Sequence, residues 1–197
     1  MQIDENILIT WGAVVKKYNK NEIIFDEGAL AQFYFQIKNG TVKMSNSNDD
    51  CKEFTQGVFH DGDSFGEPPL FIDESYPATA ITITDCTIIK LSKATFFKIL
   101  SEYPAIHHTF TTLFAKRVLM KSKLLRDIIN HTPEERIISF LHAFKAKSNA
   151  KEDKIHIPYT RQEIGNFIGL RVETVIRTIK KLEETRRVTI KQRKLYF

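Results

Sequence analysis

Two residues near the C-terminal end have the types and the spacing needed to read a nucleic acid. Glu173 and Arg177, in the stretch RVETVIR, are four residues apart, which places them one turn apart on one face of a helix. An arginine can donate two hydrogen bonds to O6 and N7 of guanine, and a glutamate can accept one from the amino group of cytosine. The alternative is an ordinary surface ion pair. We expect the pair to read base edges of double-stranded DNA.

A helix-turn-helix is the element that would present this pair. Thr160 and Glu163 form a capping box, which starts a short helix. Gly169 follows at the point where a sharp turn needs a left-handed backbone. Apolar residues recur at helical spacing on both sides of this turn and would face inward: Ile164, Phe167, Ile168, Val175, Ile179 and Leu182. The second helix then keeps Glu173, Arg177 and Lys180 on its outer face.

Polar and cationic residues of these two helices suit contacts with phosphate. Side chains and backbone amides at a helix N-terminus commonly hold phosphate oxygens. The residues expected to do so, which include one lysine farther along the second helix, are Thr160, Arg161, Gln162, Arg171, Thr174 and Lys180. The last residues, RRVTIKQRKLYF, read as a short β-hairpin that adds cations beside the second helix. Together these features predict a winged helix-turn-helix.

The charge of the chain is divided between its two halves. Residues 1–100 contain 14 acidic residues, nine lysines and no arginine, a net charge of −5. Residues 101–150 carry a net charge of +4, and residues 151–197 a net charge of +6. An acidic front and a basic rear indicate two roles, with a polyanion as the partner of the rear.

The front half has the signals of a β-rich domain. Six of the eight glycines occur in the first 66 residues, among short β-branched runs. Asn39-Gly40 stands between two such runs and predicts a tight β-hairpin. The segment from Thr79 to Leu91 is a long β-branched stretch with partial alternation. Many short strands with glycine turns predict an antiparallel, jelly-roll-like β-roll.

A long helix is expected between the two halves, from about residue 105 to 129. Apolar residues recur there at heptad spacing and would form a dimer seam, interrupted by Arg117: Ile106, Phe110, Leu113, Met120 and Leu124. A second apolar stripe lies beside it: Phe114, Val118, Leu125 and Ile129. The alternative is a helix buried within a single subunit. Thr132, Pro133 and Glu135 then predict the start of a further helix.

The overall prediction is an α+β chain in three parts. Residues 1–103 form a β-roll sensor domain, residues 104–130 a dimerisation helix, and residues 131–197 a winged helix-turn-helix. No apolar run approaches the roughly 20 residues that a membrane-spanning helix requires. The N-terminus lacks the features of a secretory signal, and Cys51 and Cys86 have no metal-ligand spacing. We therefore expect a cytoplasmic protein with reduced thiols and no membrane contact.

From about Lys17 onward the chain resembles the Crp/Fnr transcription regulators, named for the catabolite activator and the fumarate-nitrate regulator. The resemblance is strongest in TRQEIGNFIGL and ETVIR. Val172 stands where catabolite activators carry an arginine, which brings the second helix closer to the fumarate-nitrate branch. Ile176 stands where that branch uses a small polar residue to read bases. The resemblance implies a homodimer that binds an inverted-repeat DNA site, with RNA polymerase as a further partner.

The same resemblance locates an effector pocket in the roll. Family members that bind cyclic nucleotides carry a glycine–glutamate pair and then an arginine with a small residue; the glutamate holds the ribose and the arginine the phosphate. The residues in pocket positions here are Gly66, Glu67, Ala78, Thr79, Lys121 and Ser122. Pro77 occupies the place of the arginine, and no arginine precedes Arg117. Only a cation from the long helix, such as Lys121, could replace that arginine. We therefore expect an effector other than a cyclic nucleotide, or none.

Two other functions stay open at this point. The first is a cyclic-nucleotide-responsive regulator of the same family. The second is a metal-dependent enzyme built on the roll, with an incidental basic tail. Such an enzyme would need several histidines around one ion, whereas His60 is the only histidine before His107. The cysteines that hold an iron–sulfur cluster in the fumarate-nitrate branch are missing, since none precedes Cys51. We therefore expect no enzyme, no metal site, no cluster and no haem.

Overall fold

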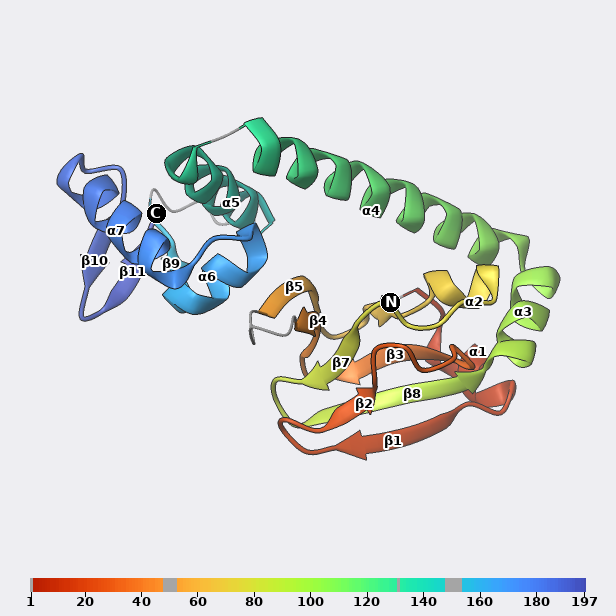
Figure 1. The fold of residues 1–197 in the computed structure, drawn as a ribbon. Coiled ribbons are helices and arrows are strands. Elements are labelled where there is room, and N and C mark those ends of the chain that lie inside the picture. The colour runs from red at the N-terminus through yellow and green to blue at the C-terminus, as the bar shows by residue number, and fades with distance from the viewer. Residues whose placement is uncertain (1, 48–52, 131, 148–153) are drawn as a thin grey trace. The chain divides into compact units, whose positions relative to one another are not determined.

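The computed structural model describes residues 2–47, 53–130, 132–147 and 154–197 (Figure 1). The chain divides into two compact units, Met1–Val118 and Leu119–Phe197, each with its own hydrophobic core. The division falls inside the long helix α4 (Pro104–Asn130). By expected role, the sequence divides the chain into a sensor domain, a dimerisation helix and a DNA-binding domain. These three parts, 1–103, 104–130 and 131–197, stay predictions.

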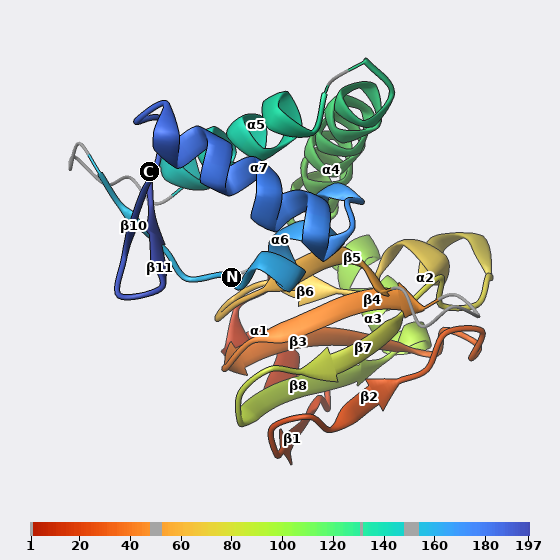
Figure 2. The same ribbon diagram turned by 60° about the vertical axis from the view of Figure 1, so that its left-hand side comes forward.

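The first unit is a roll of two four-stranded antiparallel sheets (Figure 2). One sheet has the order β1 (Val14–Tyr18), β8 (Cys86–Ser92), β3 (Phe33–Asn39) and β6 (Ser64–Phe65). The other has the order β2 (Ile23–Phe25), β7 (Thr79–Thr82), β4 (Val42–Ser47) and β5 (Glu53–Phe59). Three shorter helices belong to the same unit: α1 (Glu5–Thr10), α2 (Pro68–Ile72) and α3 (Lys93–Glu102).

One local prediction for the roll was wrong. Asn39-Gly40 does not form a hairpin, because β3 and β4 belong to different sheets. Ile37 and Val42, on either side of the turn, are both fully buried, so each strand contributes to the core from its own sheet. Gly40, at φ 109°, makes this corner, and its N–H donates to Asp61 across 2.7 Å. The β-branched stretch from Thr79 to Leu91 contains two strands, β7 and β8, which belong to different sheets.

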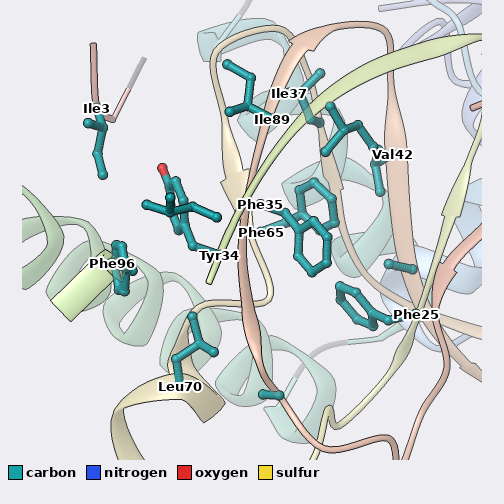
Figure 3. Packing of buried hydrophobic residues seen from close by; sticks show 14 of the residues in the cluster. Ile3, Phe25, Tyr34, Phe35, Ile37, Val42, Phe65, Leu70, Ile89 and Phe96 are labelled. Carbon is teal, nitrogen blue, oxygen red and sulfur yellow. The ribbon is translucent and has the colours of Figure 1, made fainter. Parts of the chain in front are cut away.

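Aromatic rings fill the core of the roll. Phe35 and Phe65 stack with ring centroids 5.5 Å apart, and Phe25 lies beside both (Figure 3). At the other end of the core, the rings of Tyr34 and Phe96 stack at 4.6 Å. The core therefore draws on both sheets and on α3, and it is closed from one further side by α4.

Helix α4 packs its first turns onto this core. Phe110 is fully buried, with its ring 5.2 Å from Phe96 and 5.8 Å from Tyr34. Ile106 and Leu113 pack against the same core and are half-buried. These three residues were expected to form the dimer seam, but their side chains are used within the chain. Met120 is 53% exposed, and the side chain of Leu124 lies outside the described residues.

The second unit contains the end of α4, three further helices and a small sheet. After α4, Thr132 and Glu135 cap helix α5 (Pro133–Lys147), and the Thr132 N–H donates to the Glu135 carboxylate across 2.8 Å. The remaining elements are β9 (His156–Ile157), α6 (Arg161–Ile168), α7 (Val172–Glu184), β10 (Thr189–Lys191) and β11 (Lys194–Tyr196). The three strands form one antiparallel sheet in the order β10, β11, β9. Within the part of the chain described here, no helix combines the length and apolarity needed to cross a membrane.

Candidate functional site

The turn between α6 and α7 has the geometry that the sequence predicts. The Glu163 N–H donates to Thr160 Oγ1 across 3.1 Å, and the Thr160 N–H donates to the Glu163 carboxylate across 2.7 Å, which completes the capping box. Gly169 ends α6 in a left-handed conformation with φ 66°. The six residues expected to face inward are buried or half-buried in the core of the second unit. The turn therefore fixes the apolar face of α7 against α6, and the opposite face of α7 points outward.

Arg136 on α5 supports this turn and is not among the residues that the sequence predicts. Its guanidinium donates to the carbonyl of Ile168, the last residue of α6. A side chain on Gly169 would lie 3.2 Å from the same nitrogen atom. Burial lowers the pKa of Arg136, and its Nε is buried without a hydrogen-bond partner among the described residues. The arginine thus connects α5 to the turn. An arginine in the first turns of a helix is usually a surface cation, so the sequence gives no signal that Arg136 contacts Ile168.

The outer face of α7 carries four exposed residues at positions i, i+3, i+4 and i+7: Glu173, Ile176, Arg177 and Lys180. Glu173 is in the first turn, where the helix dipole favours a carboxylate. Within the described part of the chain, Glu173 and Arg177 do not form the ordinary surface ion pair. Their side chains therefore face solvent, with the hydrogen-bonding groups of both available.

The residues expected to contact phosphate fall into two groups. Thr160, Arg161 and Lys180 line one hollow, of about 590 Å³, between the start of α6, the side of α7 and the hairpin β10–β11. Arg161 is half-buried; burial lowers its pKa, and the nearby Glu183 carboxylate acts in the opposite direction. The other three, Gln162, Arg171 and Thr174, are not among the lining residues of this hollow. Gln162 uses its amide to donate to Asn166 Oδ1 across 2.8 Å, and Arg171 is exposed at the N-cap of α7.

The hairpin β10–β11 confirms the predicted wing. Gln192 and Arg193 form its two-residue turn with φ 48° and 63°, the left-handed values that such a turn requires at both positions. Arg193 and Lys194 also line the 590 Å³ hollow. The wing therefore places two cations opposite α7, next to Arg161 and Lys180.

In the roll, the predicted pocket residue Glu67 is paired with a cation of the chain itself. Glu67 is fully buried, and Arg117 of α4 donates from Nη1 to its carboxylate across 2.9 Å. Arg117 Nη2 donates to the Ser64 carbonyl across 2.8 Å, and the Ser64 hydroxyl donates to Glu67. Burial, and then the Glu67 charge, raise the pKa of Tyr34. The sequence offers one signal for this contact, because Arg117 interrupts an apolar seam.

Of the other predicted pocket residues of the roll, Gly66 directly precedes Glu67, whereas Ala78 directly precedes and Thr79 begins β7, which belongs to the other sheet. Gly66, at φ 73°, is covered by the rings of Phe25 and Tyr76, since a side chain there would lie 2.9 Å from Phe25 Cζ. Those two rings stack at 3.7 Å, and burial raises the pKa of Tyr76 to about 12. Ala78 is fully buried. The Thr79 hydroxyl accepts from the Glu27 N–H across 3.1 Å.

At the place of the family's arginine, Pro77 has neither a guanidinium nor a backbone N–H to donate. The carbonyl of Pro77 accepts from the side-chain amide of Asn46 and, across 3.4 Å, from that of Gln56. Lys121 and Ser122, the remaining pocket candidates, are exposed on the part of α4 that belongs to the second unit. Among the side chains that the structure describes, no three of His, Cys, Asp or Glu are grouped so that they could hold a metal ion.

Comparison with known families agrees with both halves of this description. Residues 15–103 match the family "Cyclic nucleotide-binding domain", and residues 135–196 match the family "Crp-like helix-turn-helix domain". The chain belongs to the Crp/Fnr family of regulators. The family assignment confirms the predicted fold class and a DNA-binding transcription regulator rather than an enzyme.

Individual Crp/Fnr relatives cover most of the chain at low identity. The cAMP-activated global transcriptional regulator CRP of Haemophilus influenzae is 29% identical over 171 residues, which are 85% of this chain and 76% of that protein. Among solved structures, the c-di-GMP responsive regulator CLP of Xanthomonas campestris has a TM-score of 0.83 at 20% identity, covering 97% of this chain and 98% of its own. A CooA mutant of Carboxydothermus hydrogenoformans also has a TM-score of 0.83, at 19% identity, covering 98% and 87%. These structures share the fold.

Proposed function

We propose that this Crp/Fnr regulator is a cytoplasmic homodimer that binds an inverted-repeat DNA site and reads it with Glu173 and Arg177. The observation behind the proposal is the outer face of α7, where both side chains are exposed within the first two turns of the helix. A recognition helix meets base edges with its N-terminal residues. Arg177 would donate to guanine, and Glu173 would accept from cytosine or orient Arg177.

Phosphate contacts would come from the residues around α7. The hollow lined by Arg161, Lys180 and the wing cations Arg193 and Lys194 has the positive charge that a DNA backbone requires. Thr160, Gln162, Arg171 and Thr174 complete the proposed set at the two helix starts. RNA polymerase is the further partner expected of such a regulator.

The dimer would form through the second apolar stripe of α4. Val118 and Leu125, seven residues apart, are 63% and 58% exposed. An apolar pair at heptad spacing on an exposed helix face suits a coiled-coil contact with the same helix of a partner. Both stripes begin on the roll, since Leu113 of the first and Phe114 of the second pack against its core. Beyond Phe114 the second stripe offers an exposed heptad pair, and we therefore transfer the proposed seam to Val118 and Leu125.

The proposed effector of the roll is not a cyclic nucleotide. The Glu67 carboxylate, which would hold the ribose, already accepts from Arg117 and Ser64. At the place of the phosphate-binding arginine, Pro77 has no N–H and its carbonyl is an acceptor. A bound phosphate would lose water without gaining a matching donor from that position.

Selection of bound sequences from random duplex DNA, at a stated salt concentration, tests the proposal. The expected result is an inverted repeat whose half-site centres lie about 34–36 Å apart, because a two-fold dimer places its recognition helices in successive major grooves. Each half should contain a G·C pair whose change weakens binding by about 1–3 kcal/mol. Enrichment of no sequence would overturn the proposed base reading.

A further inference from the structure

One large apolar side chain lies in the middle of the outer face of α7. Ile176 is 42% exposed and is flanked on that face by Glu173, Arg177 and Lys180. Other residues of the same helix pack in the core of the second unit: Val175, Ile179 and Leu182 are 0–1% exposed. Ile176 therefore faces the same way as the proposed base-reading residues.

Ile176 also lies where two surface hollows adjoin. It lines the 590 Å³ hollow toward the wing and a second one, of about 550 Å³, which is bordered by Glu173 and Arg177. Lys180 is the other side chain that lines both hollows. Contact along this face would bury Ile176 between charged neighbours, so whatever binds there must meet an apolar group at this point.

We propose that Ile176 contacts the C5 methyl group of a thymine, at the base pair next to the one that Arg177 reads. This inference rests on the proposed function and adds a second specified position to each half-site. Adjacent residues of an α-helix differ by about 1.5 Å along its axis and about 100° around it, so they point at different base pairs. Arg177 fixes the G·C position, and Ile176 specifies its neighbour.

The chemistry of the major groove explains why thymine would be preferred. Guanine presents two acceptors there, cytosine an amino group, and adenine an acceptor and a donor, whereas thymine alone adds an apolar methyl group. Isoleucine has no donor or acceptor to offer. It would strip water from the polar edges without replacing the lost hydrogen bonds, which is unfavourable. Against thymine it gains apolar contact, so it favours T·A and disfavours G·C.

Replacement of thymine by uracil in the selected site tests this inference, because it removes the methyl group and leaves every hydrogen-bonding group in place. Each thymine of the half-site is replaced in turn, and affinities are measured for the full chain. At one position the unmodified protein should lose about fourfold in affinity per half-site, the factor expected for one buried methyl group. Ile176→Ala should be insensitive to uracil there, and Ile176→Leu should keep the sensitivity. Arg177→Ala, weaker throughout, should also keep it.

The outcomes separate this inference from the proposed function. If Ile176→Ala loses the same factor on uracil as the unmodified protein, or if no thymine position is sensitive, the methyl contact is overturned while specific binding stands. If no sequence is selected at all, the proposed base reading fails, and this inference fails with it. Since Ile176 is outside the core, thermal unfolding should show both variants folded, and Ile176→Leu repeats the test with an apolar side chain of equal volume.

Discussion

Arg117 Nη1 lies 2.9 Å from Glu67 Oε2, and this contact joins helix α4 to the loop that would hold a cyclic nucleotide in related regulators. The carboxylate is fully buried and the arginine side chain is 25% exposed, so the pair is largely shielded from water. Its hydrogen bonds to Ser64 complete a small polar network inside an aromatic core. The buried Glu67 carboxylate is thus neutralised by Arg117 of the same unit, without a ligand.

Removal of this arginine should destabilise the roll. Arg117→Ala leaves Glu67 buried without its cation, which costs about 3 kcal/mol in the free energy of unfolding. Trp11 is the single tryptophan of the chain and packs against the roll core, so its fluorescence during urea unfolding reports this unit. The exposed neighbour Lys116→Ala should change the free energy by less than about 0.5 kcal/mol. Equal midpoints for Arg117→Ala and Lys116→Ala would contradict the role given to the pair.

Cyclic AMP should not stabilise the protein. A ligand of the native state raises the free energy of unfolding by RT ln(1 + [L]/Kd), so binding would appear as a rise in melting temperature. Because Glu67 is engaged by Arg117 and Pro77 replaces the phosphate-binding arginine, we expect no measurable rise with cyclic AMP or cyclic GMP. A saturable increase of several degrees with a micromolar midpoint would show that the pocket opens to nucleotide.

Two arginines of the helix-turn-helix should have different effects on DNA binding. Arg177→Ala should cost about 1–3 kcal/mol per half-site and relax preference at one G·C pair, because a bidentate contact is lost. Arg161→Ala should weaken binding to all sequences alike and reduce the salt dependence, because phosphates are the same at every site. Binding curves with the selected site and with that pair inverted provide the measurement. The assignment of the reader is wrong if Arg177→Ala still distinguishes the two duplexes fully.

The exposed stripe of α4 should control assembly. Glutamate at both Val118 and Leu125 places like charges at the proposed seam, so the double variant should be monomeric at micromolar concentration and bind DNA weakly. Lys116→Glu serves as the matched control, because residue 116 lies roughly half a turn away from residue 118 on the helix. Analytical ultracentrifugation distinguishes the species. A monomeric unmodified protein, or a dimeric double variant, would refute the seam.

The helix-turn-helix could be predicted closely from sequence because its signals are local. The capping box at Thr160, the turn at Gly169 and the buried stripe each involve residues within a few positions of one another. The contact of Arg136 with Ile168 spans 32 residues and leaves no local trace. The contact of Arg117 with Glu67 spans 50 residues, and its one local sign is the cation that interrupts an apolar seam.

The errors in the roll have the same origin. Asn39-Gly40 has the composition of a hairpin turn, but the choice between pairing side by side and turning into a second sheet depends on the partners β8 and β7, far along the chain. The heptad stripe of α4 was correctly recognised as apolar. Whether it faces a partner or the chain's own core depends on the surface that Tyr34 and Phe96 provide, which the pattern on α4 does not contain.

The position of Phe110 has a consequence for how the protein is made. During synthesis, strand β1 cannot pair until β8 has been made, roughly 70 residues later. The core stays open until Phe110 has been added. Closing such long loops slows folding, so the emerging chain exposes Tyr34, and later also Phe96, until Phe110 has been added. A fragment that ends at residue 103, where the matched cyclic nucleotide-binding domain ends, should therefore aggregate, whereas one that extends through Val118 should fold by itself.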